Sequence, residues 1–140
     1  MSLDFEGKVA IVTGSGGGIG KGYALELGKR GAKVVVNDLG GAVDGSGGSL
    51  TAAETVVKEI QDNGGDAMAN GANVCNQDEV KNMVEQAMEK WGRVDVLVNN
   101  AGILRDKSFA KMPWEDFVTV VNVHLLGSAL CAHTVLSLIH

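Results

Sequence analysis

Residues 9–20 restrict the fold of this 140-residue chain more than any other stretch. Val9–Val12 is a short apolar run, and Thr13 and then five glycines within seven residues follow it. The run predicts a buried strand, and residues from Ile19 onward predict a helix. The glycines allow a tight turn between the two, because glycine has no Cβ and adopts backbone angles closed to other residues. The first helical N–H groups are unpaired and carry partial positive charge, so this turn favours a phosphate group. A loop with only a structural role is the alternative.

The next predicted strand ends on an acidic residue. Lys33–Asp38 is apolar through its centre, as expected of a strand that is covered on both faces. In the connecting helix, Ile19, Tyr23 and Leu27 fall on one face, with Ala24 beside them. Asp38 lies 18 residues after the last glycine of the turn. A carboxylate there can accept hydrogen bonds from the ribose hydroxyls of adenosine and repels a 2′-phosphate. We therefore expect NAD rather than NADP as the cofactor, with a solvated aspartate at a strand end as the alternative.

Strand-like and helix-like segments continue to alternate along the rest of the chain. We expect strands over 67–74 and 94–98 and helices over 76–91 and 113–139. A glycine-rich surface loop is expected over 40–48. This alternation is typical of an α/β fold with a parallel sheet.

Two motifs together resemble the signatures of the short-chain dehydrogenase/reductase family. Thr13–Gly20 reads TGSGGGIG, which has the spacing TGxxxGxG, and Asn99–Gly102 reads NNAG. The resemblance implies a Rossmann-type doubly wound parallel sheet with strand order 3-2-1-4. It also implies one NAD-binding domain over residues 1–140, which corresponds to the amino-terminal, cofactor-binding half of the family. The strings VVVNDLGG and NNAGILRD are similar to the (3R)-hydroxyacyl-CoA dehydrogenase part of peroxisomal multifunctional β-oxidation enzymes and their bacterial relatives.

The resemblance also implies which residues lie beside the cofactor. In the glycine turn they are Gly14, Ser15, Gly16, Gly17, Gly18, Ile19 and Gly20. At the other strand ends they are Asp38, Asn73, Val74, Asn99, Ala101 and Gly102. The family usually has Asp-Val where this chain has Asn73-Val74, and an asparagine carbonyl can accept the same hydrogen bond from the adenine amino group. Asn122 matches the helix asparagine of the family's Asn-Ser-Tyr-Lys catalytic set; an asparagine that is satisfied inside a helix pair is the alternative.

The family's reaction is hydride transfer between a nicotinamide and a secondary alcohol or ketone. Its general acid/base is the tyrosine of a Tyr-x-x-x-Lys motif. This chain has one tyrosine, Tyr23, and no lysine after Lys111, so the motif is absent. The resemblance implies an oxidoreductase that acts on a small molecule such as a 3-hydroxyacyl-CoA, and we expect this truncated chain to be inactive alone. The alternative is a catalytically silent nucleotide-binding or interaction module.

Composition narrows the partners and the compartment. The net charge of −5 without a cluster of basic residues argues against nucleic acid and anionic membranes as partners. The start of the chain, MSLDFEGK, lacks the apolar core of a secretory signal. We therefore expect a cytoplasmic or, alternatively, a peroxisomal protein in which Cys75 and Cys131 are free, buried thiols. His124 and His133 lie on opposite faces of a helix, so we expect no metal site.

The predicted helix over 113–139 is apolar around most of its circumference. Asn122, His124, Ser128, His133, Thr134 and Ser137 interrupt the apolar run. Polar groups inside a membrane are costly, so we expect a buried helix or a subunit interface rather than a membrane span. The family uses this helix for oligomer contacts, and the resemblance therefore implies a homo-oligomer. We also expect the fourth strand to be an open edge of the sheet.

Overall fold

A computed structural model describes residues 3–39 and 48–139 of the chain. Within them, one parallel sheet has the strand order β3-β2-β1-β4, which confirms the predicted fold class and strand order. The strands are β1 Val9–Val12, β2 Lys33–Asn37, β3 Asp66–Asn70 and β4 Val96–Val98. The helices are α1 Gly18–Lys29, α2 Gly48–Asp62, α3 Gln77–Trp91, α4 Trp114–Val121 and α5 Gly127–Leu138, with a 3-10 turn at Phe109–Lys111. The loop expected over 40–48 lies outside the described residues, except for Gly48, which begins α2.

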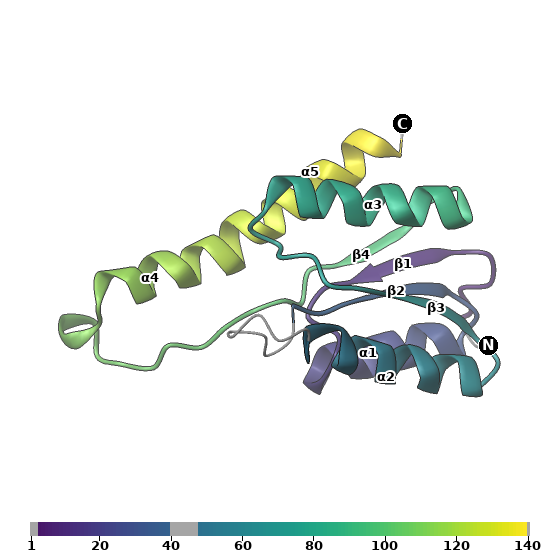
Figure 1. The fold of residues 1–140 in the computed structure, drawn as a ribbon, viewed down its shortest axis with the longest axis horizontal. Helices are drawn as coiled ribbons and strands as arrows, with labels where there is room; N and C mark the ends of the chain where they lie inside the picture. The colour runs from purple at the N-terminus through teal and green to yellow at the C-terminus, as the bar shows by residue number, and fades with distance from the viewer. Residues whose placement is uncertain (1–2, 40–47, 140) are drawn as a thin grey trace.

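Helices cover both faces of the sheet. α1 and α2 lie on one face, and α3 and α5 lie on the other (Figure 1). Because β1 and β2 are central strands, their side chains alternate between the two cores: Ile11 and Val35 pack with α3, whereas Val12, Val34 and Val36 pack with α2. β4 is half-exposed along its length and forms one edge of the sheet, as expected.

The face of α1 that packs on the core is only partly the predicted one: Leu27 packs against the core and the neighbouring Ala24 is buried, but Ile19 and Tyr23 are exposed. The buried residues are Gly20, Ala24 and Gly28, whereas Ile19 is 70% exposed and Tyr23 is 47% exposed. Small residues occupy the packed face because they let the helix approach its neighbours closely. A Cβ on Gly28 would lie 2.8 Å from Ile60 of α2. Larger side chains on that face would hold α1 away from the core.

β3 is shorter than the predicted strand over 67–74, and a side chain explains where it ends. Asn70 is its last residue, and the Ala72 backbone N–H donates to Asn70 Oδ1 at 2.8 Å. An asparagine that bonds the backbone two residues later forms an Asx turn, which competes with continued strand pairing. Residues 71–74 therefore leave the sheet and run along its carboxyl edge.

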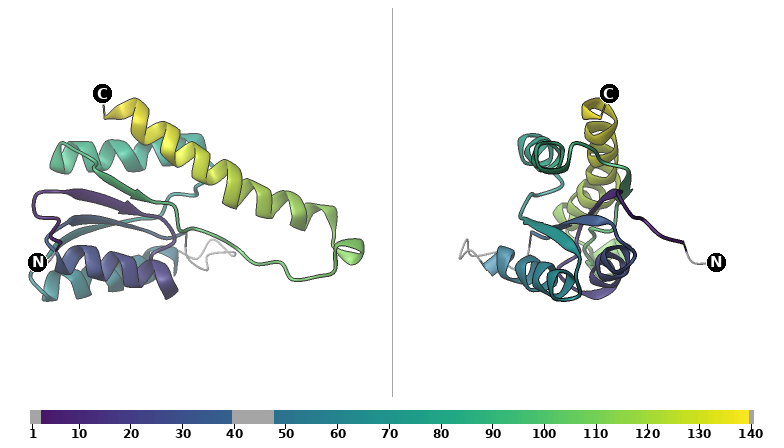
Figure 2. Two further views of the ribbon diagram at one scale, coloured as in Figure 1. Left: turned by 180° about the vertical axis from the view of Figure 1, so that it is seen from behind. Right: turned by 90° about the vertical axis from the view of Figure 1, so that its right-hand side faces the viewer.

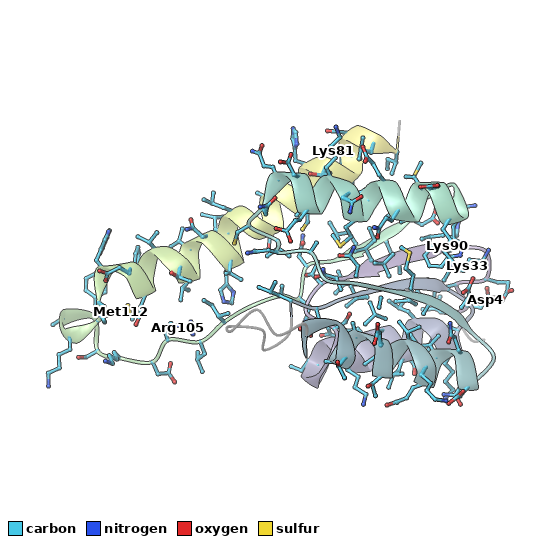
Figure 3. All side chains as sticks on the ribbon, in the orientation of Figure 1. Asp4, Lys33, Lys81, Lys90, Arg105 and Met112 are labelled. Atoms are coloured by element: carbon cyan, nitrogen blue, oxygen red, sulfur yellow. The ribbon has the colours of Figure 1, made fainter. Side chains whose placement is uncertain are left out.

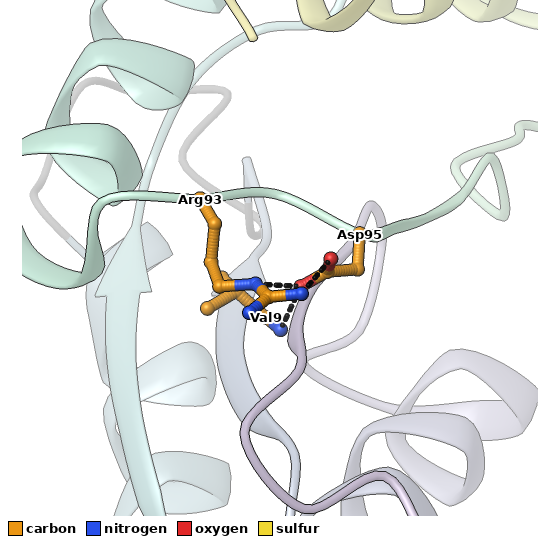
Figure 4. A network of polar contacts seen from close by, with 3 residues as sticks. All are labelled: Val9, Arg93 and Asp95. Atoms are coloured by element: carbon orange, nitrogen blue, oxygen red, sulfur yellow. Dashed lines mark hydrogen bonds and ion pairs between the residues drawn. The ribbon is translucent and has the colours of Figure 1, made fainter.

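At the opposite, amino-terminal edge, a carboxylate fixes the pairing of β1 with β4 (Figure 4). Asp95 Oδ2 accepts hydrogen bonds from the Val9 backbone N–H at 2.9 Å and from Arg93 Nε at 2.8 Å. Asp95 Oδ1 accepts from Arg93 Nη2 at 2.7 Å. The hydrogen bonds from Arg93, more than the one from Val9, hold the pKa of Asp95 below its usual value. Arg93 therefore neutralises the Asp95 carboxylate within the chain.

α4 and α5 form one long helix that extends well beyond the sheet (Figures 1 and 2). They are joined by a π-helical segment, Asn122–Leu126. α5 buries residues against α3, but in the described structure none of the residues of α4 is buried. Arg105 and Met112 lie on the arm that leads out to α4, far from the labelled Asp4 and Lys33 at the other end of the molecule (Figure 3).

The long helix is also apolar enough to be compared with a membrane span. Trp114–Leu138 is 25 residues long, and an 18-residue stretch of it has a mean hydropathy of 1.4, so by length and composition alone the helix is able to cross a bilayer; only 17% of that stretch is buried within the described residues. Trp114 stacks on Phe117 at 4.9 Å between ring centroids, and Phe109 meets the same ring edge-on. An apolar surface thus runs along the exposed part of the helix.

The two cysteines differ in their surroundings. Cys131 is fully buried in the core beside α3, and burial raises the pKa of its thiol to about 11. Cys75 is exposed, which corrects the expectation that both thiols are buried. The reason is that Cys75 follows Val74 in the segment that has left the sheet.

Candidate cofactor-binding site

The turn between β1 and α1 is packed directly against the turn after β4. Gly14 has φ +64°, and a Cβ there would lie 2.8 Å from Ala101 Cα. A Cβ on Gly20 would contact the Asn100 side-chain amide. The close approach of the NNAG segment therefore requires glycine at both positions, and the backbone conformation requires it at Gly14 as well.

Thr13 and Asn100 hold the two turns together. Thr13 is buried, and its Oγ1 accepts hydrogen bonds from the backbone N–H groups of Asn100 at 3.1 Å and Ala101 at 3.0 Å. In return, Asn100 Nδ2 donates to the carbonyl oxygens of Thr13 and Gly14, both at 3.1 Å. Asn100 was not among the predicted site residues. The signal that could have identified it is the pair of asparagines itself, because only one of the two can point toward the glycine turn.

The amino end of α1 is open to a ligand. Its first flanking residue is Gly17, no side chain in the described part of the chain caps the helix, and no acidic residue lies in its first turn. A Cβ on either Gly17 or Gly18 would meet nothing within 4 Å among the described atoms. Helix N–H groups without a side-chain cap, beside open space, fit a phosphate group, and the residues present therefore fit the pyrophosphate of a dinucleotide.

Asp38 lies beside this turn, as the sequence predicted. Its Oδ2 accepts the Gly16 backbone N–H at 2.7 Å, and its own N–H donates to the Asn70 carbonyl at 3.0 Å. A Cβ on Gly16 would overlap the Asp38 carboxylate, so the glycine allows the contact. The carboxylate is thus held at the carboxyl end of β2, within the reach of a ribose whose phosphate is bound at α1.

A cleft of about 300 Å³ lies at the carboxyl edge of the sheet. Six of the predicted cofactor-side residues line it: Gly14, Asp38, Asn73, Val74, Ala101 and Gly102. Six residues that were not predicted complete its lining: Asn37, Leu39, Ala72, Asn100, Ile103 and Val123. The structure therefore brings the ends of β1, β2, β3 and β4 together around one cavity.

Two of the predicted residues have partners that turn them away from the cleft. Ser15 is fully buried, and its hydroxyl donates to the Val12 carbonyl at 2.7 Å. Asn99 Nδ2 donates to the Ser128 carbonyl at 3.2 Å and so ties β4 to α5. Gly16, Gly17, Gly18, Ile19 and Gly20 lie beside the cleft, in the turn and the start of α1, rather than in its lining.

Asn73 and Val74 form the wall beyond β3. Asn73 Oδ1 accepts the Cys75 backbone N–H at 2.9 Å, which orients the amide. Val74 is buried, and it packs against α5 at Gly127, where a Cβ would lie 2.8 Å from Val74 Cγ2. This wall therefore rests on the long helix.

Asn122 begins the π-helical segment of the long helix. The Gly127 backbone N–H donates to the Asn122 carbonyl, five residues earlier, instead of to the residue four earlier. Two residues after Asn122, His124 Nε2 lies 3.1 Å from the Ile103 nitrogen and 2.9 Å from the Ile103 oxygen. His124 is exposed and contacts the loop after NNAG. Asn122 itself does not line the cleft, and its catalytic role stays a prediction.

No group of three or more His, Cys, Asp or Glu side chains within residues 3–39 and 48–139 is arranged to hold a metal ion.

Comparison with known proteins identifies the family. The model of the short chain dehydrogenase family matches residues 8–140. The chain belongs to the short chain dehydrogenase family. A peroxisomal hydratase-dehydrogenase-epimerase of Saccharomyces cerevisiae is 55% identical over 126 residues, which are 90% of this chain and 14% of the yeast protein. A 3-oxoacyl-[acyl-carrier-protein] reductase of Synechocystis is 47% identical over 128 residues, which are 91% of this chain and 49% of that reductase.

A solved structure of the same family has the same fold. The crystal structure of a short chain dehydrogenase from Mycobacterium avium aligns with a TM-score of 0.86 and 47% identity, and covers 94% of this chain and 46% of that one. The chain therefore spans about half the length of that short chain dehydrogenase and less of the multifunctional yeast relative. Family and fold together imply a nicotinamide nucleotide as the cofactor.

Proposed function

We propose that this chain forms the NAD-binding half of an oxidoreductase. The observation that carries the proposal is the position of Asp38, whose carboxylate is held next to the glycine turn by the Gly16 N–H. A carboxylate in that place accepts hydrogen bonds from the ribose hydroxyls of NAD and repels the 2′-phosphate of NADP. When bound, the cofactor supplies the hydride acceptor, while the chain's own groups bind its phosphates, ribose and adenine.

Calorimetric titration with NAD and with NADP tests this preference. We expect tighter binding of NAD, and we expect Asp38→Asn to weaken NAD and to strengthen NADP relative to it. Asp62→Asn is the matched control, because Asp62 lies at the far end of α2, where it pairs with Lys58. Tighter binding of NADP by the unaltered protein would contradict the assignment.

We further propose that the substrate is a secondary alcohol or ketone carried on an acyl thioester, such as a 3-hydroxyacyl-CoA. Support comes from the names of the relatives, a hydratase-dehydrogenase-epimerase and a 3-oxoacyl-[acyl-carrier-protein] reductase. Asn122 is the proposed catalytic residue of this half, and we propose that the 140-residue chain alone is inactive because it has no Tyr-x-x-x-Lys motif. NADH formation from a 3-hydroxyacyl-CoA by this chain alone would refute the proposal that the chain is inactive. Binding of NAD without turnover by any longer natural form would favour a silent nucleotide-binding module.

The long helix over 113–139 is the proposed homo-oligomer contact. Its exposed apolar residues include Trp114, Leu125, Leu126 and Leu136, which are 56–65% exposed. Burial of such an apolar surface against a second copy is favourable. The net negative charge of the whole chain disfavours nucleic acid as a partner. We expect sedimentation velocity to show an oligomer that Leu125→Glu weakens; a monodisperse monomer would contradict the proposal.

The yeast relative is named as peroxisomal, so we favour that compartment over the cytoplasm for this protein.

A further inference from the structure

Three side-chain amides form a continuous hydrogen-bonded row at the carboxyl edge, and neither the signature motifs nor the proposed function uses them. Asn37 ends β2, Asn70 ends β3, and the two residues are paired in the ladder. Asn37 Nδ2 donates to Asn70 Oδ1 at 3.1 Å, and Asn70 Nδ2 donates to Gln86 Oε1 of α3 at 3.2 Å. Asn37 is 1% exposed and Asn70 is 7% exposed, so these two amides lie inside the protein, and the half-buried Gln86 ends the row at the surface.

Backbone partners fix the orientation of both asparagine amides. Asn37 Nδ2 also donates to the Ala72 carbonyl at 3.0 Å, and Asn70 Oδ1 also accepts the Ala72 N–H at 2.8 Å. Both polar groups of Ala72 are therefore held by the two asparagines. Ala72 begins the run Ala72-Asn73-Val74 that lines the cleft.

Asn37 has a second connection, to the phosphate side of the cleft. Its carbonyl oxygen accepts the Ser15 N–H at 2.8 Å, and the Ser15 hydroxyl lies 3.4 Å from the same oxygen. One buried residue thus holds both the glycine turn and the wall after β3. Since Asp38 directly follows Asn37, the Asn37–Asn70 pair also sets the position of the proposed ribose-binding carboxylate.

We infer that Asn37 and Asn70 are positioning residues that set the affinity for the adenosine part of the cofactor. They hold the wall at 72–74 at a fixed separation from the glycine turn, so the adenosine does not have to order that wall when it binds. Preorganisation of this kind raises affinity by lowering the ordering cost of binding. The inference rests on the proposed function, because it assumes that the cleft receives a dinucleotide.

Calorimetry with ADP-ribose, the cofactor without nicotinamide, tests the inference in the natural protein at its full length. Asn70→Ala removes the acceptor for both Asn37 and Ala72, and we expect ADP-ribose to bind about tenfold more weakly, the equivalent of one hydrogen bond of about 1.4 kcal/mol. Asn70→Asp keeps that acceptor, so we expect it to restore most of the affinity. Gln86→Leu, on the half-buried face of α3, removes only the outer bond, and we expect a loss of about threefold.

Thr134→Val is the structural control, because Thr134 is similarly buried but bonds only within α5, at the Leu130 carbonyl. We expect this variant to lower the melting temperature without changing the ADP-ribose affinity. Hydrogen exchange without ligand gives an independent readout: the Ala72 amide should exchange faster in Asn70→Ala and remain protected in Asn70→Asp.

Unchanged ADP-ribose affinity in folded Asn70→Ala and Gln86→Leu, with only the melting temperature lowered, would overturn the inference and leave the row a stability feature. Failure of the unaltered protein to bind ADP-ribose would instead refute the proposed function, so the two failures are distinguishable. If Asn70→Ala does not fold, the comparison of Gln86→Leu with Thr134→Val tests the inference instead. Equal ADP-ribose affinity in these two variants would also overturn the inference.

Discussion

Two helices, α1 and α3, begin at the same edge of the sheet, and their first turns are built in opposite ways. α3 starts with Asn76, whose Oδ1 accepts the Glu79 N–H at 3.0 Å, and it has Asp78 and Glu79 in its first turn. α1 starts with Gly17 and has neither a side-chain cap nor an acid. α3 therefore satisfies its own amino end, whereas α1 leaves its N–H groups and partial positive charge for another anion. This is the difference that we expect between a helix start that binds an anion and one with only a structural role.

The strongest way to break this contrast is to give α1 the cap that α3 has. Gly17 has the extended conformation typical of a capping residue, with φ −166° and ψ 178°. We expect Gly17→Asp to stabilise the protein slightly, by about 0.5 kcal/mol, through the helix N–H groups and dipole. The same carboxylate repels a pyrophosphate, and at an effective dielectric of about 20 two charges about 4 Å apart repel by about 4 kcal/mol. Calorimetry should therefore show NAD affinity lowered by at least about 100-fold.

Gly17→Asn separates the effect of the negative charge from the effect of a side chain that fills the helix start, because asparagine caps the helix without a charge. We expect a smaller loss of NAD affinity in this variant than in Gly17→Asp. Equal NAD affinity in Gly17→Asp and the unaltered protein would show that the amino end of α1 is not the phosphate site.

The open start of α1 depends on the turn that precedes it, and Thr13→Val tests that dependence. Valine has the shape of threonine but leaves the N–H groups of Asn100 and Ala101 without their buried acceptor. We expect a loss of about 2–4 kcal/mol in the free energy of unfolding, measured by urea denaturation, and weaker NAD binding. Thr13→Ser retains the hydroxyl and should recover most of both quantities. A loss of stability with unaltered NAD affinity would mean that NNAG does not position the glycine turn.

Asp95, at the far edge of the sheet, provides a charge that the chain satisfies internally. Asp95→Asn loses charge-assisted hydrogen bonds, and we expect the free energy of unfolding to fall by about 2 kcal/mol without a change in NAD affinity. Because the folded-state pKa of Asp95 is lowered, this contribution is present above the unfolded pKa of about 3.9 and is lost as the pH falls through the folded pKa. The difference between the two proteins in urea melts should therefore persist at pH 7 and vanish at lower pH. A difference that does not change with pH would contradict this explanation.

The smallest expected effect sharpens the comparison from the side of α3. Asn76→Ala removes the cap, and we expect a cost of about 1 kcal/mol in thermal unfolding. We expect no change in NAD affinity, because the amino end of α3 is satisfied by its own Asn76. Asn76→Ser should recover most of the stability, and weaker NAD binding in Asn76→Ala would show that the two helix starts are not independent.

The elements that the sequence predicted well are those whose local pattern and tertiary environment agree. β2 is a run of valines that is buried on both faces, and the placement of Asp38 follows from its end. The packing face of α1 was predicted only in part, because the close approach of neighbouring segments selects Gly20, Ala24 and Gly28, which a count of large apolar residues does not detect. A hydrophobic period identifies a helix, but it does not show how closely the helix packs against its neighbours.

The polar part of the cleft was harder to predict for a related reason. Asn37 and Asn100 bond to backbone groups that are distant in sequence, and Asn70 also accepts from the distant Asn37 side chain, so no local spacing encodes these partners. Ser15 and Asn99 belong to the motifs, as Asn100 does, and yet bond away from the cleft. Membership in a motif therefore locates a turn, but the direction of each side chain depends on the neighbouring strands.

The π-helical segment at Asn122–Leu126 has a consequence for the angular phase of the long helix. Each helical residue turns the chain by about 100°, so one extra residue in a turn rotates everything after it by that angle. Gly127, Cys131 and Val135 face the rest of the protein only with this added rotation. A regular α-helix of the same residues would turn that face away from α3, whereas deletion of one residue within 122–126 would remove the extra residue and keep the face in place. The face that α5 presents to α3 therefore depends on the extra residue that the π turn holds.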